Sequence, residues 1–338
     1  MSETTPPPKV IQDLAVAYWA SRCLHVVAEL GIADVLGDEP QTALHLAQAS
    51  NTHPQALHRV LRALCNHGIF VHDGATFAHN AASRVLRGDA PGSMRSLTRM
   101  MGLKVHWDAY RELDAGLRTG QPAISSVVDG GLFGYLQHHP EAGRLFDEAM
   151  AGKSFAQVGP IVEAYDFSGF RTIGDIGGGL GHMLNGVLER TPGARGVLFD
   201  LPQVIAQARQ AANPRIDYIG GDFFKDPIPP CDAYLLMTVL HDWSDEESIA
   251  ILRNIKARAP RNAKLLILEG VVQPDARDHF LLDLDIEMLV MTTGRERTQQ
   301  EWDAVIRGAA LRLARVIPAG QWSSIIEVDL PGNGGEAL

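Results

Sequence analysis

A glycine-dense turn between two apolar runs constrains this chain more than any other stretch. The run Thr172–Ile176 leads into the turn Gly177–Gly181, a helical pattern follows, and a second apolar run, Gly196–Phe199, ends in Asp200. A strand, a tight turn, a helix and a second strand form the unit from which parallel sheets are built. Glycines at such a turn let the backbone come close to a ligand, because no Cβ stands in the way.

The acidic residues around this turn indicate which ligand it would hold. Asp200 ends the second strand, 25 positions after Asp175, where a carboxylate can accept hydrogen bonds from a ribose diol. The dinucleotide pattern G-x-G-x-x-G is not completed, because its sixth position counted from Gly177 is His182. The carboxylate of Asp175 would repel a pyrophosphate but could receive the ammonium of an amino-acid group, directly or through water. The pattern favours S-adenosylmethionine (SAM) over NAD; a glycine turn without a ligand is the alternative.

Composition limits the remaining possibilities. The chain has 338 residues, enough for two domains, and its formal charge of −10 argues against a protein that mainly binds nucleic acid or an anionic membrane. Its three cysteines are far apart and without C-x-x-C spacing, which is typical of buried thiols in a reducing compartment. No signal peptide and no run of 18 apolar residues is present, so we expect a cytoplasmic protein.

Residues 42–87 predict a winged-helix-like module. Thr42 can cap a short helix, Pro54 begins a second helix that ends near Gly68, and a small hairpin turns at Asp73. Such a module can read DNA or can serve for dimerisation, and its few arginines in an acidic chain favour dimerisation. The pair Tyr18–Trp19 in a long apolar helix can be a dimer contact or part of the core.

The rest of the chain predicts a helical segment and then an α/β fold. We expect three parts: a winged-helix-like dimerisation domain at 1–95, a helical linker and pocket roof at 96–165, and a nucleoside-binding domain at 166–338. Seven strands alternate with helices in the last part, which predicts a doubly wound, Rossmann-like sheet. The expected strands are 172–176, 196–200, 215–219, 232–238, 263–269, 313–318 and 322–329, and the expected helices are 180–190, 203–212, 245–259, 279–292 and 298–310. The last two strands must be antiparallel, because Ala319-Gly320 is too short for a crossover.

Ligands of such sheets bind beyond the carboxyl ends of the strands, which directs attention to the residues there. The third strand runs into Asp222 and Phe223, which can meet the edge and the face of an adenine ring. The fourth strand ends just before His241, and Ser244 can cap the next helix with Glu247 as its partner. His241 is therefore expected at the cleft, where its ordinary pKa suits a general base.

Two carboxylates could orient that histidine. Either Glu269, at the end of the fifth strand, or Glu296 could hold its second ring nitrogen and favour the imidazolium. Glu296 could instead form a surface salt bridge with Arg295 or Arg297. A metal site is a further alternative, with His279 and Asp283 on one helix face and Asp285 nearby, but Asp285 points off that face. We therefore expect no metal.

Four motifs in order resemble a known family. The succession DIGGG at 175–179, FDLP at 199–202, GDFF at 221–224 and HDWSD at 241–245 resembles the SAM-dependent O-methyltransferases of the plant caffeic-acid and acetylserotonin type. Bacterial relatives of that type modify aromatic natural products such as phenazines, anthracyclines and naphthoates. The resemblance covers nearly the whole chain and includes the N-terminal dimerisation region. Met237 departs from it, because plant relatives tend to carry a lysine there.

The resemblance implies roles for individual residues. It implies that SAM is contacted by Gly177, Asp200, Leu201, Asp222 and Phe223, to which the residue pattern adds Asp175. It implies His241 as the base, flanked by Glu269 and Glu296. It implies an acceptor pocket lined by Trp107, Phe146, Met150, Asp285 and Met288. The implied protein is a homodimer that releases S-adenosylhomocysteine.

The expected reaction is methylation of a phenolic hydroxyl on an aromatic secondary metabolite such as a hydroxyphenazine or a polyketide. A phenol with a pKa of about 10 is mostly protonated at neutral pH, so a base is useful. Two alternatives from other classes are a ligand-responsive winged-helix DNA-binding regulator and an NAD(P)-dependent oxidoreductase. An amine or carbon acceptor is a closer variant, which His241 makes less favoured.

Overall fold

The computed structural model describes residues 6–273 and 279–330, and the chain divides into two compact units, Met1–Trp107 and Asp108–Leu338. The first unit is mainly helical. Its elements are α1 (Pro7–Val16), α2 (Tyr18–Glu29), α3 (Ile32–Leu36), β1 (Gln41–Thr42), α4 (Ala43–Ala49), α5 (Pro54–Asn66), β2 (Val71–His72), β3 (Thr76–Ala78), α6 (Ala81–Arg84), α7 (Arg95–Met101) and α8 (Lys104–Arg111), which runs past the boundary of the unit.

The predicted winged-helix-like module is confirmed in this unit. The Thr42 hydroxyl accepts from the backbone N–H of His45 at 3.2 Å and caps α4, and Pro54 is the first residue of α5. The hairpin β2–β3 turns at Asp73, whose carboxylate accepts from the N–H groups of Ala75 and Thr76. Strand β1 pairs with β3 and completes a three-stranded sheet, which the sequence pattern did not predict.

Helix α1 and the start of α2 leave large apolar side chains uncovered. No residue of α1 is buried, and Tyr18 and Trp19 at the start of α2 are 54% and 60% exposed. The pair therefore does not belong to the core of this unit. The core instead forms between α2, α3, α4, α5 and the small sheet, around residues such as Ile32, Leu61 and Phe77.

The second unit begins with helices and continues as a seven-stranded sheet. Gly120 ends one of these helices and Gly130 precedes another, and both glycines adopt left-handed conformations. The helices before the sheet are α9 (Leu113–Thr119), the 3₁₀ turn η1 (Ala123–Ser126), α10 (Gly131–His138) and α11 (Pro140–Ala164). The strands are β4 (Thr172–Ile176), β5 (Arg195–Asp200), β6 (Ile216–Gly220), β7 (Ala233–Met237), β8 (Lys264–Glu269), β9 (Arg312–Pro318) and β10 (Ser324–Asp329).

The strand order is β6-β5-β4-β7-β8-β10-β9. The first five strands are parallel, and β10 is antiparallel to both β8 and β9, as the short connection required. The order reverses between β4 and β7, which is where ligands of open α/β sheets bind. The predicted seven-stranded, doubly wound, Rossmann-like sheet is confirmed.

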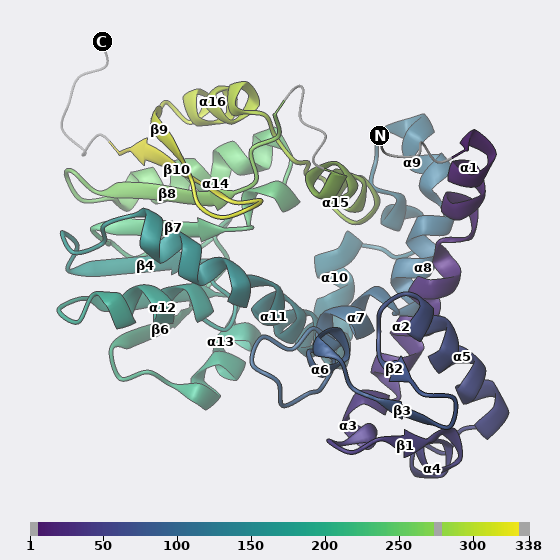
Figure 1. Ribbon diagram of the computed structural model, residues 1–338. Coiled ribbons are helices and arrows are strands. Elements are labelled where there is room, and N and C mark those ends of the chain that lie inside the picture. Colours follow the sequence, from purple (N-terminus) through teal and green to yellow (C-terminus); the bar gives the residue numbers. More distant parts are fainter. Residues whose placement is uncertain (1–5, 274–278, 331–338) are drawn as a thin grey trace. The chain divides into compact units, whose positions relative to one another are not determined.

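Helices cover both faces of the sheet (Figure 1). One face packs against α14 and α16, and the other packs against α11, α12 and α13. The five predicted helices are present: α12 (His182–Arg190), α13 (Pro202–Ala208), after which the 3₁₀ turn η2 (Arg209–Ala211) follows, α14 (Asp245–Arg258), α15 (His279–Met291) and α16 (Gln299–Gly308). A further 3₁₀ turn, η3 (Leu240–Asp242), was not predicted and lies just before α14. No helix of the described residues is long and apolar enough to cross a membrane.

Candidate active site

The glycine turn after β4 lies against residues that follow β6 and β7. Gly177, Gly179 and Gly181 have φ angles of 67°, 56° and 80°, in the left-handed region that favours glycine. A Cβ on Gly177 would lie 3.0 Å from a methyl group of Val239 and 3.5 Å from the ring of Phe223. The structure therefore brings the turn close to Phe223, and a side chain at residue 177 would press against Val239.

Asp175 lies beneath the turn. Its carboxyl group is fully buried, and neither oxygen has a hydrogen-bond partner among the described side chains. A Cβ on Gly178 would lie 2.5 Å from its Cγ, so the turn's backbone covers the carboxyl group. Burial, with the nearby Asp200, raises the pKa of Asp175 to about 7. The predicted contact with an ammonium group stays a prediction.

Asp200 is the last residue of β5, and its side chain bonds to the glycine turn that follows β4. Its carboxylate accepts from the N–H of Gly179 at 2.8 Å and from the N–H of Leu201 at 2.7 Å. Burial raises its pKa although these two bonds favour the charged form. Leu201 is the residue just before α13, and its side chain is exposed. Asp200 thus lies beside the turn, at the place where the sequence expects a ribose-binding carboxylate.

Asp222 and Phe223 follow β6 at the same edge of the sheet. Asp222 accepts from the N–H of Phe224 at 2.9 Å and from the ammonium of Lys225 at 2.8 Å. The ring of Phe223 meets Trp243 edge to face at 5.8 Å, and Trp243 stacks on Phe133 of α10 at 5.1 Å. Trp243 and Phe133 extend the aromatic surface beyond what the sequence motifs indicated.

These residues fit SAM better than a dinucleotide. The groups at this edge of the sheet are the carboxylates of Asp200 and Asp222, the aromatic face of Phe223 and the buried carboxyl group of Asp175. Such groups suit a ribose, an adenine and an ammonium, and the carboxyl group of Asp175 beneath the glycine turn would repel the pyrophosphate that a dinucleotide places there. The residues present therefore fit the cofactor that the motifs predict.

His241 lies in the 3₁₀ turn between β7 and α14 and is 4% exposed. Its Nδ1 donates to Oε1 of Glu296 at 2.7 Å, while Glu269 Oε2 lies 4.0 Å from the same nitrogen. The other carboxylate oxygen of Glu269 accepts from the backbone N–H groups of Val239, Leu240 and His241. Glu296 therefore orients the ring and Glu269 holds the loop that carries it, so the surface salt bridge considered for Glu296 does not form.

The electrostatics of the histidine are set by burial and by three acids. Burial favours the neutral ring, but Glu269, Asp242 and Glu296 outweigh it and raise the pKa of His241 to about 9. Burial also raises the pKa of Glu269. Because Nδ1 donates to Glu296, Nε2 is the nitrogen left to exchange a proton with an acceptor; its nearest acid is Asp242, whose Oδ1 lies 3.8 Å away.

A narrow cavity opens beside the histidine. It is lined by Lys153 and Gln157 of α11, by Phe280 of α15, by Trp322 and, around His241, by Thr238, Glu269 and Glu296. Thr238 has a φ of 48°, an unusual conformation for a β-branched residue. Such strain is common at functional sites, and here it occurs where β7 turns toward His241.

The residues expected to line the acceptor pocket lie in different environments. Asp285 accepts from the N–H of Glu296 at 2.8 Å, which links α15 to the histidine's partner, and Met288 is buried on the same helix. Phe146 and Met150 are half-buried on α11, and Phe146 meets Phe133 edge to face at 6.2 Å. Trp107 belongs to the first unit, where its ring meets His25 edge to face at 6.1 Å.

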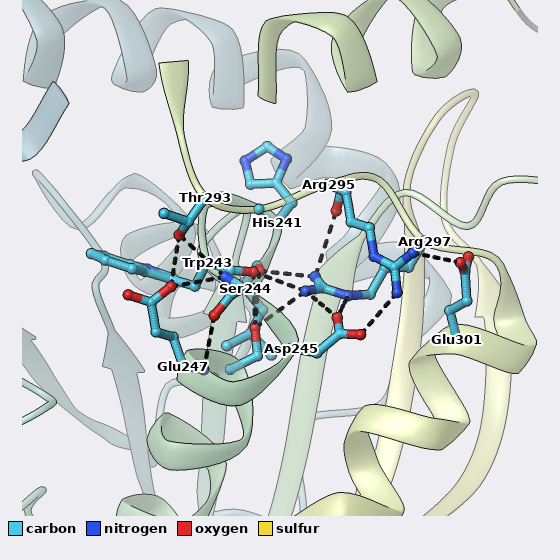
Figure 2. Close-up of polar contacts among 12 residues, drawn as sticks. His241, Trp243, Ser244, Asp245, Glu247, Thr293, Arg295, Arg297 and Glu301 are labelled. Carbon is cyan, nitrogen blue, oxygen red and sulfur yellow. Dashed lines mark hydrogen bonds and ion pairs between the residues drawn. The ribbon is translucent and has the colours of Figure 1, made fainter. Parts of the chain in front are cut away.

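Some residues around His241 were not predicted from the sequence. Asp242 adds charge beside Nε2. Gly294 packs against the backbone of residues 240–245, which we call the histidine loop, and the buried Arg297 bonds to the same loop. Each is adjacent to His241 or Glu296, or two positions from one of them, so proximity along the chain to a predicted site residue was the available signal. Ser244 and Glu247 form the expected capping box, which Thr293 joins (Figure 2).

The metal alternative involves His279, Asp283 and Asp285 of α15. Within the described part of the chain, no group of three histidines, cysteines or acids could hold a metal ion. The side chain of His279 lies outside the described residues.

Two family models and several known proteins match this chain. Residues 110–312 match an O-methyltransferase domain, and residues 12–89 match an O-methyltransferase dimerisation domain. Phenazine O-methyltransferase PhzM of Lysobacter antibioticus is 36% identical over 328 residues, which covers 95% of this chain and 96% of the relative. The mitomycin biosynthesis 6-O-methyltransferase of Streptomyces lavendulae is 36% identical over 323 residues, or 92% of this chain and 91% of the relative.

A third relative is named for a different acceptor atom. The 8-amino-8-demethylriboflavin N,N-dimethyltransferase of Streptomyces davaonensis is 36% identical over 329 residues, which covers 93% of this chain and 92% of the relative.

Solved structures agree over the full fold. The structure of LaPhzM has a TM-score of 0.93 at 36% identity and covers 96% of this chain and 100% of its own. Human N-acetylserotonin methyltransferase in complex with SAM has a TM-score of 0.89 at 25% identity, with 98% and 100% covered. These comparisons give no support to a DNA-binding regulator or an NAD(P)-dependent oxidoreductase. The chain belongs to the family of SAM-dependent O-methyltransferases that carry an N-terminal dimerisation domain.

Proposed function

We propose that this enzyme methylates a phenolic hydroxyl of an aromatic secondary metabolite, such as a hydroxyphenazine or a polyketide, with His241 as the general base. The observation that carries the proposal is the buried pair of His241 and Glu296, joined at 2.7 Å with Nε2 left for the acceptor. The relatives named for phenazine and mitomycin methylation support an aromatic acceptor of this kind.

The bound cofactor supplies an electrophilic methyl group on a sulfonium. In this proposal Asp200 accepts hydrogen bonds from the ribose, and Leu201 contacts the nucleoside next to it. Asp222 and Phe223 hold the edge and face of the adenine. Gly177 lets the backbone approach, while Asp175 supports the turn from below and attracts the ammonium. This arrangement fixes the direction from which an acceptor can approach.

His241 accepts the hydroxyl proton on Nε2 as the acceptor oxygen attacks. The imidazolium that forms is stabilised by Glu296 through Nδ1 and by the charge of Glu269 and Asp242. At neutral pH His241 is already largely protonated in the free enzyme. An acceptor that binds as a phenolate therefore pairs with the imidazolium, which gives the same phenolate–imidazolium pair that proton transfer from a phenol would give. Alignment of the reacting atoms can contribute roughly 7–11 kcal/mol, and the base about 10²–10⁴-fold.

The acceptor ring is proposed to lie among flat and adaptable side chains. Phe146, Met150 and Met288 supply them, and Asp285 accepts a hydrogen bond from the backbone N–H of Glu296 and so holds that residue in place. Aromatic and methionine side chains suit a planar ligand because they offer large apolar contacts with little polar demand.

A second candidate is an amine acceptor. It is favoured by the relative named as an N,N-dimethyltransferase, which is as identical to this chain as the phenazine enzyme. A neutral aromatic amine needs no proton removed before it attacks, so His241 would matter less for it.

The test is turnover with SAM on matched pairs of hydroxylated and aminated polycyclic aromatics. We expect the hydroxylated member to be methylated, and His241→Gln to lower its rate by roughly 10²–10⁴-fold with SAM affinity unchanged. Unaltered turnover in the variant would mean that proximity alone suffices, and preferential turnover of the amine would favour the second candidate. Raised thermal stability with SAM but not with NADH checks the cofactor independently, and Asp200→Ala should weaken that effect.

We also propose that the enzyme works as a homodimer through its N-terminal unit, in the cytoplasm. The dimerisation-domain match and the uncovered apolar side chains of α1 and α2 support the dimer. The three cysteines are all free, which suits a reducing compartment. No nucleic acid or membrane partner is proposed.

A further inference from the structure

A buried arginine contacts the histidine loop from the side opposite the imidazole. The side chain of Arg297 is 0% exposed, and its guanidinium lies against the backbone of residues 240–245. Figure 2 shows the ring of His241 pointing away from this guanidinium. Arg297 therefore contacts the loop that carries the proposed base without contacting the base itself.

Arg297 bonds to backbone carbonyl groups that precede and follow His241 along the chain. Nη1 donates to the carbonyl of Leu240 at 3.0 Å, and Nη2 donates to the carbonyl of Trp243 at 2.8 Å. Nε donates to Asp245 at 2.9 Å, which ties the same group to the first residue of α14. A planar guanidinium offers its donors in a rigid fork, so these contacts fix the spacing between the two carbonyls.

The arginine is itself held in place. Its guanidinium lies over the ring of Trp302 at 5.0 Å, and Trp302 Nε1 donates to the carbonyl of Gly270, the residue after Glu269. The N–H of Val272 donates to the carbonyl of Arg297 at 2.9 Å. A buried charge is costly unless it is fully bonded, and here every part of the guanidinium has a partner.

The neighbouring residue, Glu296, holds the other part of the histidine. One short segment thus supplies a carboxylate to the imidazole and a guanidinium to the loop backbone. A change in the loop would move Nδ1 relative to a carboxylate that is anchored separately through Asp285. The 2.7 Å bond therefore depends on both anchors.

We propose that Arg297 is a positioning residue for the methyl-transfer reaction, which keeps His241 in register with Glu296 by clamping the carbonyls of Leu240 and Trp243. This inference rests on the proposed function of His241 as the base. If it is correct, a change at Arg297 lowers kcat, whereas a change in an ordinary surface ion pair would not.

Arg297→Lys is the variant that tests it. Lysine keeps the positive charge, so the field at His241 changes little, but a single ammonium cannot reproduce the fork. We expect kcat to fall by about tenfold to a hundredfold, the range expected for a small misplacement of a catalytic group, with the dissociation constant of SAM unchanged. We also expect the pKa of His241, followed by NMR of ¹⁵N-labelled histidine and assigned with His241→Gln, to fall below its value in the parent enzyme.

Arg295→Lys is the matched control. Arg295 also pairs with Asp245, at 2.8 Å, and with Glu301, at 2.9 Å, but it makes no bond to the carbonyls around His241 (Figure 2). We expect this control to keep the parent kcat and the parent pKa of His241.

The outcomes separate the two hypotheses. If His241→Gln lowers kcat while a folded Arg297→Lys enzyme keeps the parent kcat and the parent pKa of His241, the positioning role of Arg297 is overturned. The role of His241 as the base is then retained. If His241→Gln retains the parent kcat, the proposed base is overturned first. Should Arg297→Lys not fold, Asp245→Ala replaces it, because it removes the acceptor that orients the guanidinium through Nε; parent-like kcat and pKa in that variant would equally contradict the proposal.

Discussion

The ring of His241 is surrounded by more negative charge than a general base needs. Three carboxylates raise its pKa to about 9, against burial that would lower it. At pH 7 the free ring is therefore mainly protonated and must lose its proton, or meet an ionised acceptor, before methyl transfer. The three acids stabilise the imidazolium that proton transfer produces. They also reduce the fraction of free enzyme in which His241 is neutral and can accept a proton.

The first prediction concerns the pH dependence. We expect log kcat/KM to rise by about one per pH unit from neutral pH and to level off near the pKa of His241, because only the neutral ring accepts a proton. Initial rates between pH 6 and 10 with one phenolic acceptor measure it. With an acceptor whose hydroxyl is already ionised, His241→Gln should lose less activity; an equal loss would argue against proton acceptance by the ring.

The second prediction concerns Glu296. Its carboxylate favours the imidazolium, so Glu296→Gln should lower the pKa of His241 and move the ascending limb of the pH–rate profile to lower pH. The maximal rate should fall, because a neutral amide stabilises the imidazolium less. Glu301→Gln is the comparison, since Glu301 is a nearby acid in α16 that pairs with Arg295 instead of His241. A profile unchanged in Glu296→Gln would show that the bond at Nδ1 does not control the ring.

At the scale of the element, the segment from Gly294 to Arg297 fixes the position of the histidine loop. A Cβ on Gly294 would overlap the carbonyl oxygen of His241 and lie 2.5 Å from the backbone nitrogen of Trp243. We expect Gly294→Ala to displace the loop, to lower kcat strongly and to destabilise the fold by about 1–3 kcal/mol, as overpacking does. Steady-state kinetics and chemical denaturation measure the two effects.

Gly193→Ala is the control for that change, because a Cβ on Gly193 would meet nothing within 4 Å. It should leave kcat and stability close to those of the parent. A Gly294→Ala enzyme with the parent kcat would show that the loop tolerates the displacement.

The elements and the residues at their ends could largely be predicted from the sequence. Strong apolar periodicity placed each strand, and the short Ala319-Gly320 link required the antiparallel pair. The pairing of His241 with Glu296 could not be predicted, because 55 residues separate them and Glu269 was an equal candidate. Arg297 looked like a surface charge, since one sequence does not show that a guanidinium is buried under a loop.

At the scale of the whole molecule, the N-terminal unit contains surface that a monomer would leave in water. Helix α1 has ten residues, none of them buried, with Ile11 and Leu14 about as exposed as Trp19. A helix this short is marginal in water without packing against something else. A second copy of the chain, which the dimerisation-domain match favours, would cover this apolar surface.

Trp19→Lys should therefore weaken the proposed homodimer, because it places a charge in the centre of the apolar surface formed by α1 and the start of α2. Sedimentation velocity at several concentrations should show a dimer for the parent and a shift toward monomer for the variant. Leu117→Lys is the control, since Leu117 is 72% exposed on α9 and lies outside the matched dimerisation domain. If both variants sediment as the parent does, α1 and α2 are not the dimer contact; if the parent is monomeric, the homodimer itself is excluded.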